Sequence, residues 1–364
     1  MPNDPNVRYI FLTKKRAVVD RIRKSGGRID YVSRHSGLIS ARIPAREANQ
    51  LLKQSDVLLS EKDGALSLPK PKVRRILTRE EYEEAVRAAR QTLTWNIRRV
   101  WDGRPPVTAG RGIRVGVIDT GIDLNHPDLR RNIRGGVNFV NPGRLPQDGN
   151  GHGTHVAGIL AARSNRVGVV GVAPSAGLYT IKVLDNKGTG TLTDLIRGID
   201  WGIDHRMHIL NLSLAIGFDT PASLVRAVNA AVNRGILVIC AAGNSGNTRG
   251  TGDNIESPGR IPAAVAVAAT NRSNRRASFS STGSALDLSA PGVNIPSAYI
   301  DDRYAILSGT SMAAPHVSGV AAVFRQRGLT PSQTLRRLYQ RAIPLGPVRL
   351  YGKGLVRIRP LKSG

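Results

Sequence analysis

The chain has 364 residues, and its 53 Lys and Arg residues against 26 Asp and Glu residues give a formal net charge of +27. This length allows two domains with a large core, and the single cysteine excludes an internal disulfide framework. The basic residues are scattered, without a dense basic block or zinc-finger spacing, so we expect no specific nucleic-acid partner.

Residues 7–68 show the hydrophobic patterns of a small α+β domain. The predicted elements are a strand (7–12), a helix (17–23), two strands around a turn (28–43), a second helix (45–54) and a last strand or hairpin (57–68). This β-α-β-β-α-β order is typical of a ferredoxin-like domain. The charged, proline-containing stretch 69–90 then indicates a linker, with one helix pattern over 80–89.

From about residue 111 the pattern changes to apolar strands separated by helices. Strands are predicted at 113–118, 178–184, 209–214, 236–242 and 264–269, and helices at 155–163, 193–205 and 223–234. Hydrophobic strands that alternate with helices predict an α/β fold with a doubly wound, mostly parallel sheet flanked by helices. Functional groups of such folds gather at the carboxyl ends of the strands.

The N-terminal residues do not resemble a secretory signal. Met1-Pro-Asn-Asp-Pro-Asn has no apolar core, and no apolar run in the sequence is long enough to span a bilayer. We therefore expect no membrane span. The protein is expected to stay where it is made, or to be secreted if a signal was left out of this chain.

Leu307 to Gly319 contains the strongest candidate for a nucleophile. Ser308-Gly-Thr leads into Ser311, and an apolar run with helical spacing follows. Ser311 should therefore lie at the N-terminus of a buried helix, where main-chain N–H groups and the helix dipole favour a developing negative charge. From this segment alone, an N-cap serine on an ordinary core helix is an equally good interpretation.

Two other polar residues occupy comparable places at the ends of predicted elements. Asp119 closes the first strand of the larger domain, and His152 lies in a Gly-rich turn that opens a helix. Alone, each could be a turn or helix-start residue. Together with Ser311, in the order Asp, His, Ser, they supply an orienting carboxylate, a base and a hydroxyl for nucleophilic catalysis.

The chain resembles the subtilisin-like serine proteases, or subtilases, over about residues 91–356. The stretches that carry the resemblance are Val117-Ile-Asp-Thr-Gly-Ile-Asp, Asn150-Gly-His-Gly-Thr-His-Val-Ala-Gly, Asn211-Leu-Ser-Leu, Ala241-Ala-Gly-Asn, Ala290-Pro-Gly and Ser308-Gly-Thr-Ser-Met-Ala-Ala-Pro-His-Val-Ser-Gly. The resemblance implies an endopeptidase that works through an acyl-enzyme. In it, Ser311 is the nucleophile, His152 the general base and then acid, Asp119 the orienting carboxylate, and Asn244 the side-chain donor of the oxyanion hole.

The resemblance also implies where a polypeptide substrate binds. The stretches at Gly188 to Gly190 and at Ser213, Leu214 and Ala215 would pair with the substrate backbone as an added strand. Glu256 falls at the base of the first specificity pocket, where a carboxylate would favour Lys or Arg at P1, the residue before the cleaved bond. A solvated loop glutamate is an equally good interpretation of Glu256.

A structural Ca²⁺ site is implied in the same way. The positions that match it are Gln91, Asp128 and Asn165, with the carbonyl groups of Arg163, Val167 and Val169. One carboxylate, two amides and main-chain carbonyls are suitable ligands for this ion. Arg163 and Arg166 would repel a cation if their side chains faced inward.

The N-terminal domain resembles a subtilase propeptide, so we expect an inhibitory domain over 1–90 and a catalytic domain over 91–364. Self-cleavage by Ser311 is expected near Ala89–Arg90 or Arg90–Gln91, after the end of the propeptide has bound in the cleft as a substrate. A permanent regulatory domain is the alternative for residues 1–90.

Two other functions are considered. A metallohydrolase would use the pairs His152 and His155 or His205 and His208, but neither has a Glu-x-x-His frame or a convincing third ligand. His155 and His316 are better interpreted as packed residues near the site. The second alternative is a catalytically silent subtilase that serves as a binding module. We expect a monomer in either case.

Overall fold

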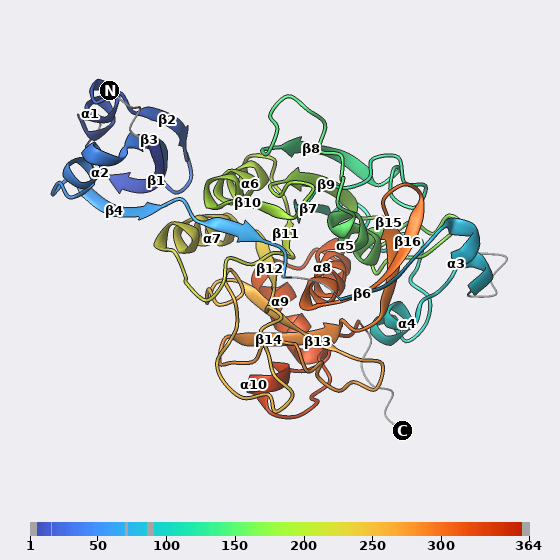
Figure 1. The fold of residues 1–364 in the computed structure, drawn as a ribbon. Helices are drawn as coiled ribbons and strands as arrows, with labels where there is room; N and C mark the ends of the chain where they lie inside the picture. The colour runs from blue at the N-terminus through green and yellow to red at the C-terminus, as the bar shows by residue number, and fades with distance from the viewer. Residues whose placement is uncertain (1–5, 16, 70–71, 86–90, 359–364) are drawn as a thin grey trace.

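The computed structural model describes residues 6–15, 17–69, 72–85 and 91–358 (Figure 1). The N-terminal domain is a four-stranded antiparallel sheet in the order β2-β3-β1-β4, with two helices packed on it through Val18, Ile22 and Leu51. Its elements are β1 (Asn6–Thr13), α1 (Ala17–Lys24), β2 (Arg28–Val32), β3 (Ile39–Pro44), α2 (Ala45–Leu52) and β4 (Val57–Lys62). The ferredoxin-like prediction is confirmed as a fold.

The larger domain is built on a seven-stranded sheet in the order β14-β13-β12-β11-β7-β9-β8, in which neighbouring strands run parallel. The strands are β7 (Arg114–Asp119), β8 (Ile133–Asn138), β9 (Gly177–Lys182), β11 (Ile209–Leu212), β12 (Leu237–Ala241), β13 (Val265–Thr270) and β14 (Leu286–Pro291). The predicted doubly wound α/β fold is confirmed. β8 and β14 are absent from the strands predicted from the sequence.

Helices cover both faces of this sheet because each buried strand presents apolar residues in alternate directions. Val115 and Val117 of β7 belong to the core that contains α5 and α8, whereas Ile118 belongs to the core that contains α6 and α7. The four helices are α5 (His152–Ala161), α6 (Leu192–Asp204), α7 (Ala222–Asn233) and α8 (Thr310–Gln326). The N-terminal ends of α5 and α8 carry His152 and Ser311.

The larger domain also contains α4 (Trp95–Trp101), α9 (Pro331–Arg341) and α10 (Val348–Tyr351). Within the ranges that the structure describes, no helix combines the length and the apolar character that crossing a bilayer requires.

The segment between the two domains is not a free linker in its described part. Of the two alternatives for 57–68, the last strand is confirmed as β4, which pairs with β1. The hairpin is wrong, because β5 (Ala65–Ser67) leaves the N-terminal sheet and pairs with β10 (Thr189–Thr191). Further on, β6 (Lys72–Leu77) pairs with β16 (Arg303–Ser308), which itself pairs with β15 (Ile295–Tyr299). In Figure 1, β6 lies beside β16 along the larger domain.

A helix follows β6 and anchors this segment. In α3 (Arg79–Ala85), the buried Tyr82 stacks on Tyr304 of β16, with ring centroids 4.6 Å apart. The helix agrees with the first part of the pattern over 80–89, and residues 86–90 lie outside the described residues. Residues 72–85 are therefore packed onto the larger domain.

The N-terminal domain contacts α6 and α7 through two carboxylates at the starts of these helices. Asp63 Oδ1 accepts the Thr193 N–H at 2.9 Å, and Glu61 Oε1 accepts the Ser223 N–H at 3.3 Å. The first N–H groups of a helix have no partner within the helix, and a carboxylate there also interacts favourably with the helix dipole. The two domains are thus connected by hydrogen bonds between carboxylates and helix N-termini as well as by the polypeptide chain.

Candidate active site

Asp119 and His152 form a buried hydrogen-bonded pair at the carboxyl end of β7. The Nδ1 of His152 lies 2.8 Å from Asp119 Oδ1, and both side chains are almost fully shielded from solvent. Since the carboxylate can only accept a hydrogen bond, Nδ1 carries a proton, and in the neutral imidazole the lone pair then lies on Nε2. The buried Nε2 has no hydrogen-bond partner in the described part of the chain. The imidazole is therefore oriented so that Nε2 is available to act as a base.

Asp148 holds the turn that places His152, and it is absent from the site residues predicted from the sequence. Its Oδ1 accepts the N–H groups of Asn150 and Gly151 at 2.9 and 3.0 Å, and its Oδ2 accepts both the N–H and the hydroxyl of Thr154. Burial raises the pKa of Asp148, while these donors favour the charged form. The signal that could have revealed it is an aspartate just before a Gly-rich helix start.

Ser311 lies in the first turn of α8, as predicted, but its hydroxyl does not bind His152. Its Oγ donates to the Ser213 carbonyl at 3.1 Å, and the Ser213 hydroxyl donates to the Ser311 carbonyl at 3.0 Å. Among the described residues, no hydrogen bond joins Ser311 Oγ to His152 Nε2. The expected carboxylate–imidazole contact is present, whereas the expected imidazole–hydroxyl contact is not.

Asn244 is held so that its amide N–H groups face the cleft. Its Oδ1 accepts the N–H and the hydroxyl of Thr310 at 3.0 and 2.9 Å, and this fixes the orientation of the carboxamide. Its Nδ2 donates to the carbonyl of Pro69 at 3.3 Å. A donor aimed at a peptide carbonyl is the arrangement needed to stabilise an oxyanion.

Glu256 supports the loop that carries Asn244. Its Oε1 accepts the Asn244 N–H at 3.0 Å and the Ser245 hydroxyl at 2.8 Å. A Cβ atom on Gly243, whose φ is +103°, would lie 2.5 Å from the same oxygen, so only glycine fits there. The structure therefore places one carboxylate oxygen of Glu256 on this loop, and its predicted role in P1 selection stays a prediction.

The predicted substrate-binding stretches hold residues 65–69 of the chain itself. Ser67 and Ala215 exchange both main-chain hydrogen bonds, each at 3.1 Å, and the Leu68 N–H donates to the Gly188 carbonyl at 3.0 Å. Opposite them, Gly190 pairs with Leu66 in the β5–β10 ladder. Gly188, Gly190 and Ala215 therefore enclose a strand of the chain itself, and their role in substrate binding stays a prediction.

Ser213 and Leu214 take different parts in this region. The Ser213 main chain faces Ser311, as described above, whereas the Leu214 side chain is buried in the core below the strand. We call the predicted propeptide, residues 1–90, the leader. Its end near residues 86–90 is the predicted occupant of the cleft, and these residues lie outside the described residues.

Several of the predicted calcium ligands converge on the Gln91 carboxamide. Its Nε2 lies within hydrogen-bonding distance of three oxygens, namely Arg163 O, Asn165 Oδ1 at 3.0 Å and Val169 O at 2.7 Å. An amide nitrogen has only two hydrogens to donate, so three acceptors around it fit a cation better than an N–H₂ group. A half-turn of the carboxamide would replace this nitrogen with an oxygen.

Asp128 completes this group. Its Oδ1 accepts the Asn165 amide at 2.9 Å, its Oδ2 accepts the Val169 N–H at 3.0 Å, and burial raises the pKa of this carboxyl to about 7. Val167 joins only through its N–H, which donates to Asn165 Oδ1 at 3.2 Å. The chemistry of the oxygens fits a Ca²⁺ ion.

The two arginines that could oppose a cation turn away from this group. Arg163 donates to Asn132 Oδ1 at 3.0 Å, and Arg166 is exposed. Arg104 does lie close, because its Nη2 donates to the Gln91 carbonyl at 3.2 Å.

The other histidines near the site have structural roles. His155 Nε2 donates to the carbonyls of Ile295 and Ala305, and burial lowers the pKa of His155 to about 3. His316 Nδ1 donates to the Met312 carbonyl, and burial lowers the pKa of His316 to about 4. Over the described ranges, no group of three or more His, Cys, Asp or Glu residues could hold a metal ion.

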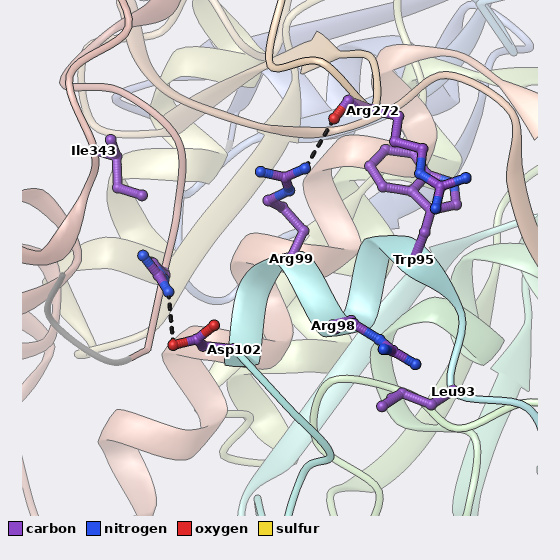
Figure 2. Close-up of a pocket in the computed structure, with 8 residues that line it drawn as sticks. Leu93, Trp95, Arg98, Arg99, Asp102, Arg272 and Ile343 are labelled. Carbon is purple, nitrogen blue, oxygen red and sulfur yellow. Dashed lines mark hydrogen bonds and ion pairs between the residues drawn. The ribbon is translucent and has the colours of Figure 1, made fainter. Parts of the chain in front are cut away.

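A basic cavity of about 480 Å³ lies apart from these residues (Figure 2). It is lined by Leu93, Trp95, Arg98, Arg99, Asp102, Arg272, Ile343 and Arg357. Asp102 Oδ2 forms an ion pair with Arg357 Nη2 at 3.0 Å, and Arg99 Nη2 donates to the Arg272 carbonyl at 2.9 Å. The cavity shares no lining residue with the site around His152 and Ser311.

A family model described as "Subtilase family" matches residues 110–354. The chain belongs to the subtilase family. It is 48% identical to subtilisin Savinase of Lederbergia lenta over 274 residues, which cover 73% of this chain and 97% of that protein. It is 47% identical to the M-protease of Shouchella clausii over 284 residues, or 76% of this chain and 71% of that protein. Subtilisin E of Bacillus subtilis is 47% identical over 253 residues, or 69% and 65% of the two chains.

These relatives establish the subtilase as a serine endopeptidase, because they are named as subtilisins and proteases and match most of the chain. The family match contains Asp119, His152, Asn244 and Ser311. It begins after the N-terminal domain and after β6 and α3.

Proposed function

We propose that Ser311, His152 and Asp119 hydrolyse peptide bonds through an acyl-enzyme, and that Asn244 stabilises the oxyanion. The observation that carries the proposal is the buried pair of His152 Nδ1 and Asp119 Oδ1 at 2.8 Å, with Nε2 left without a donor. Asn244 supports it from the other side of the cleft, since Nδ2 already binds a peptide carbonyl. In the reaction, His152 Nε2 takes the Ser311 proton and later passes it to the leaving amine.

Covalent labelling with a fluorophosphonate tests this proposal. Enzyme whose leader has been removed should be labelled at Ser311, and Ser311→Ala should not be labelled. Ser332→Ala, which changes a residue at the start of α9, is the matched control and should react like the unchanged enzyme. Absence of labelling in the processed enzyme would instead support the silent binding module.

The N-terminal domain acts in this proposal as an inhibitor that is cut from its own catalytic domain, so that the protein is made as a zymogen. Two contacts support it. Carboxylates of the N-terminal domain bind the N-termini of α6 and α7, and residues 65–69 pair with the stretches predicted to bind substrate. A mature N-terminus near Arg90 or Gln91 remains part of the proposal. The N-terminal sequence of the processed enzyme tests that boundary.

Calcium would be held by Gln91, Asp128 and Asn165 with the carbonyls of Arg163, Val167 and Val169, and it would tie the start of the catalytic domain to the loop after α5. The convergence of three oxygens on the Gln91 carboxamide supports this. A bound ion stabilises the folded state by an amount that grows with its concentration, about 2.7 kcal/mol at one hundred times the dissociation constant.

We therefore expect a chelator to lower the melting temperature of the enzyme by several degrees. Asp128→Asn should have the lower melting temperature from the start and should respond little to the chelator. Asp219→Asn, which changes an exposed loop residue, is the control and should behave like the unchanged enzyme. Differential scanning calorimetry with and without Ca²⁺ measures all three, and an equal melting temperature in both conditions would remove calcium from the proposal.

We also expect Lys or Arg to be favoured at P1, with Glu256 as the residue responsible. Glu256→Gln keeps an acceptor for the Asn244 N–H but removes the negative charge. Loss of a charge-assisted contact should lower kcat/KM for an Arg substrate by about tenfold and leave a Leu substrate almost unchanged. Peptide substrates with Arg, Phe and Leu at P1 measure this, and an aromatic preference in the unchanged enzyme would refute it.

A further inference from the structure

Pro69 occupies the position where a bound strand would offer an N–H to Ser213. In an antiparallel pair, residues exchange both main-chain hydrogen bonds at every second position. Ser67 and Ala215 make such an exchange, so the next exchanging positions along the ladder are 69 and 213. Proline has no N–H, and the Ser213 carbonyl receives nothing from the strand at this point.

The Ser311 hydroxyl takes the place of the missing donor. Its Oγ donates to the Ser213 carbonyl at 3.1 Å, while His152 Nε2 lies buried without a partner in the described structure. A hydroxyl has one proton, so Ser311 cannot donate to Ser213 and to His152 at once. The base and the nucleophile are thus uncoupled although the Pro69 carbonyl already binds Asn244.

We infer that Pro69 makes the leader a slow substrate of its own active site, and that this keeps the uncut chain latent. The inference rests on the proposed function and adds the residue that controls it. The bond presented to Asn244 is Pro69–Lys70, so the first cut falls there. A cut near Ala89–Arg90 is then a separate step.

The chemical step at Pro69 is the acylation and deacylation of Ser311 described under the proposed function. It is delayed because the Ser311 hydroxyl points to the Ser213 carbonyl. Ser311 Oγ must turn to His152, give its proton to Nε2 and form a bond to the Pro69 carbonyl carbon. The bond from that carbon to the Lys70 nitrogen then breaks, and the proton on Nε2 passes to this nitrogen. Water hydrolyses the Pro69 ester and restores the Ser311 hydroxyl.

A comparison of three peptides separates the effect of the missing N–H on the cleavage rate from the effect of the proline ring. They have the sequence Ala-Leu-Ser-Leu-Xaa-Lys, in which Xaa is proline, alanine or N-methylalanine, and are given to enzyme freed of its leader. N-methylalanine lacks the N–H but has no ring. We expect the alanine peptide to be cleaved after Xaa at least about tenfold faster than the other two, measured as kcat/KM.

The same substitution in the full chain tests latency. Pro69→Ala should shorten the half-life of the uncut chain at least about tenfold, with a new N-terminus at Lys70 and a rate independent of protein concentration. Pro142→Ala makes the same change in an exposed turn and should leave the half-life unchanged.

The results distinguish this inference from the proposed function. Cleavage of the N-methylalanine peptide as fast as the alanine peptide would overturn the inference alone, as would equal half-lives of Pro69→Ala and the unchanged chain. If the leader-free enzyme cleaves neither the alanine peptide nor denatured casein, the proposed function fails and the inference fails with it.

Discussion

Ser311→Ala is expected to lower kcat by about 10⁶-fold, the size of loss known for removal of the nucleophile in subtilisin. The reason is that the acyl-enzyme forms on the Ser311 hydroxyl, and the neighbouring Ser213 hydroxyl already donates to the Ser311 carbonyl. The residual rate should come from substrate binding and from Asn244. This variant cannot remove its own leader, so the leader and the catalytic domain are produced as separate chains. Hydrolysis of a peptide substrate by the leader-free catalytic domain then measures the loss.

The same variant should accumulate as a single uncut chain with residues 65–69 still in the cleft. Its fold should be preserved, because a small residue at the start of α8 keeps the packing of Met312 and Ala313. A circular dichroism spectrum and melting curve like those of the unchanged chain provide the control. Appearance of a new N-terminus in pure Ser311→Ala protein would show that another protease makes the cut.

Asn244→Ala is expected to lower kcat by about 10²- to 10³-fold with little change in KM. The Asn244 carboxamide is fixed by Thr310, and its Nδ2 already donates to a ground-state carbonyl at 3.3 Å. This bond should shorten as negative charge develops on the oxygen, so its loss is felt mainly in the transition state. Steady-state kinetics on one peptide substrate separates the two constants.

Asn247→Ala is the matched control for this prediction. Asn247 belongs to the same loop region but bonds Thr251 and is exposed to solvent. It should retain the kinetics of the unchanged enzyme. An Asn244→Ala enzyme with normal kcat would exclude this amide from the oxyanion hole, and a raised KM with normal kcat would give it a role in substrate binding only.

The fold could be predicted where local pattern and burial agree. Strands such as β7 and β12 are continuous apolar runs, as expected for a parallel sheet covered on both faces. β8 contains Gly135 and Gly136 and has exposed positions, so its pattern resembles a loop. β6 reads Lys-Val-Arg-Arg-Ile-Leu, and only its distant pairing with β16 makes it a strand.

The candidate site divides in a similar way. Asp119, His152 and Ser311 each carry a Gly-rich turn beside them, so the neighbouring residues revealed them. Thr310 and Asp148 act by orienting other groups, and their chemistry has no distinctive spacing. The place of Pro69 depends on the register between Ser67 and Ala215, which are separated in sequence by about half the length of the larger domain, and no local signal could have revealed it.

The pairing of β6 with β16 bears on what a molecule can do midway through maturation. After Pro69–Lys70 is broken, the main-chain bonds of β6 and the stacking of Tyr82 on Tyr304 are still in place. Because Lys72 pairs with Ser308, close to Ser311 in sequence, we expect β6 to keep blocking the part of the site that would hold residues after the cleaved bond. The part that holds residues before that bond would become free once the leader departs. Such an intermediate would accept only substrates with few residues after the cleaved bond. It would become able to cut inside a long polypeptide when β6 is removed later.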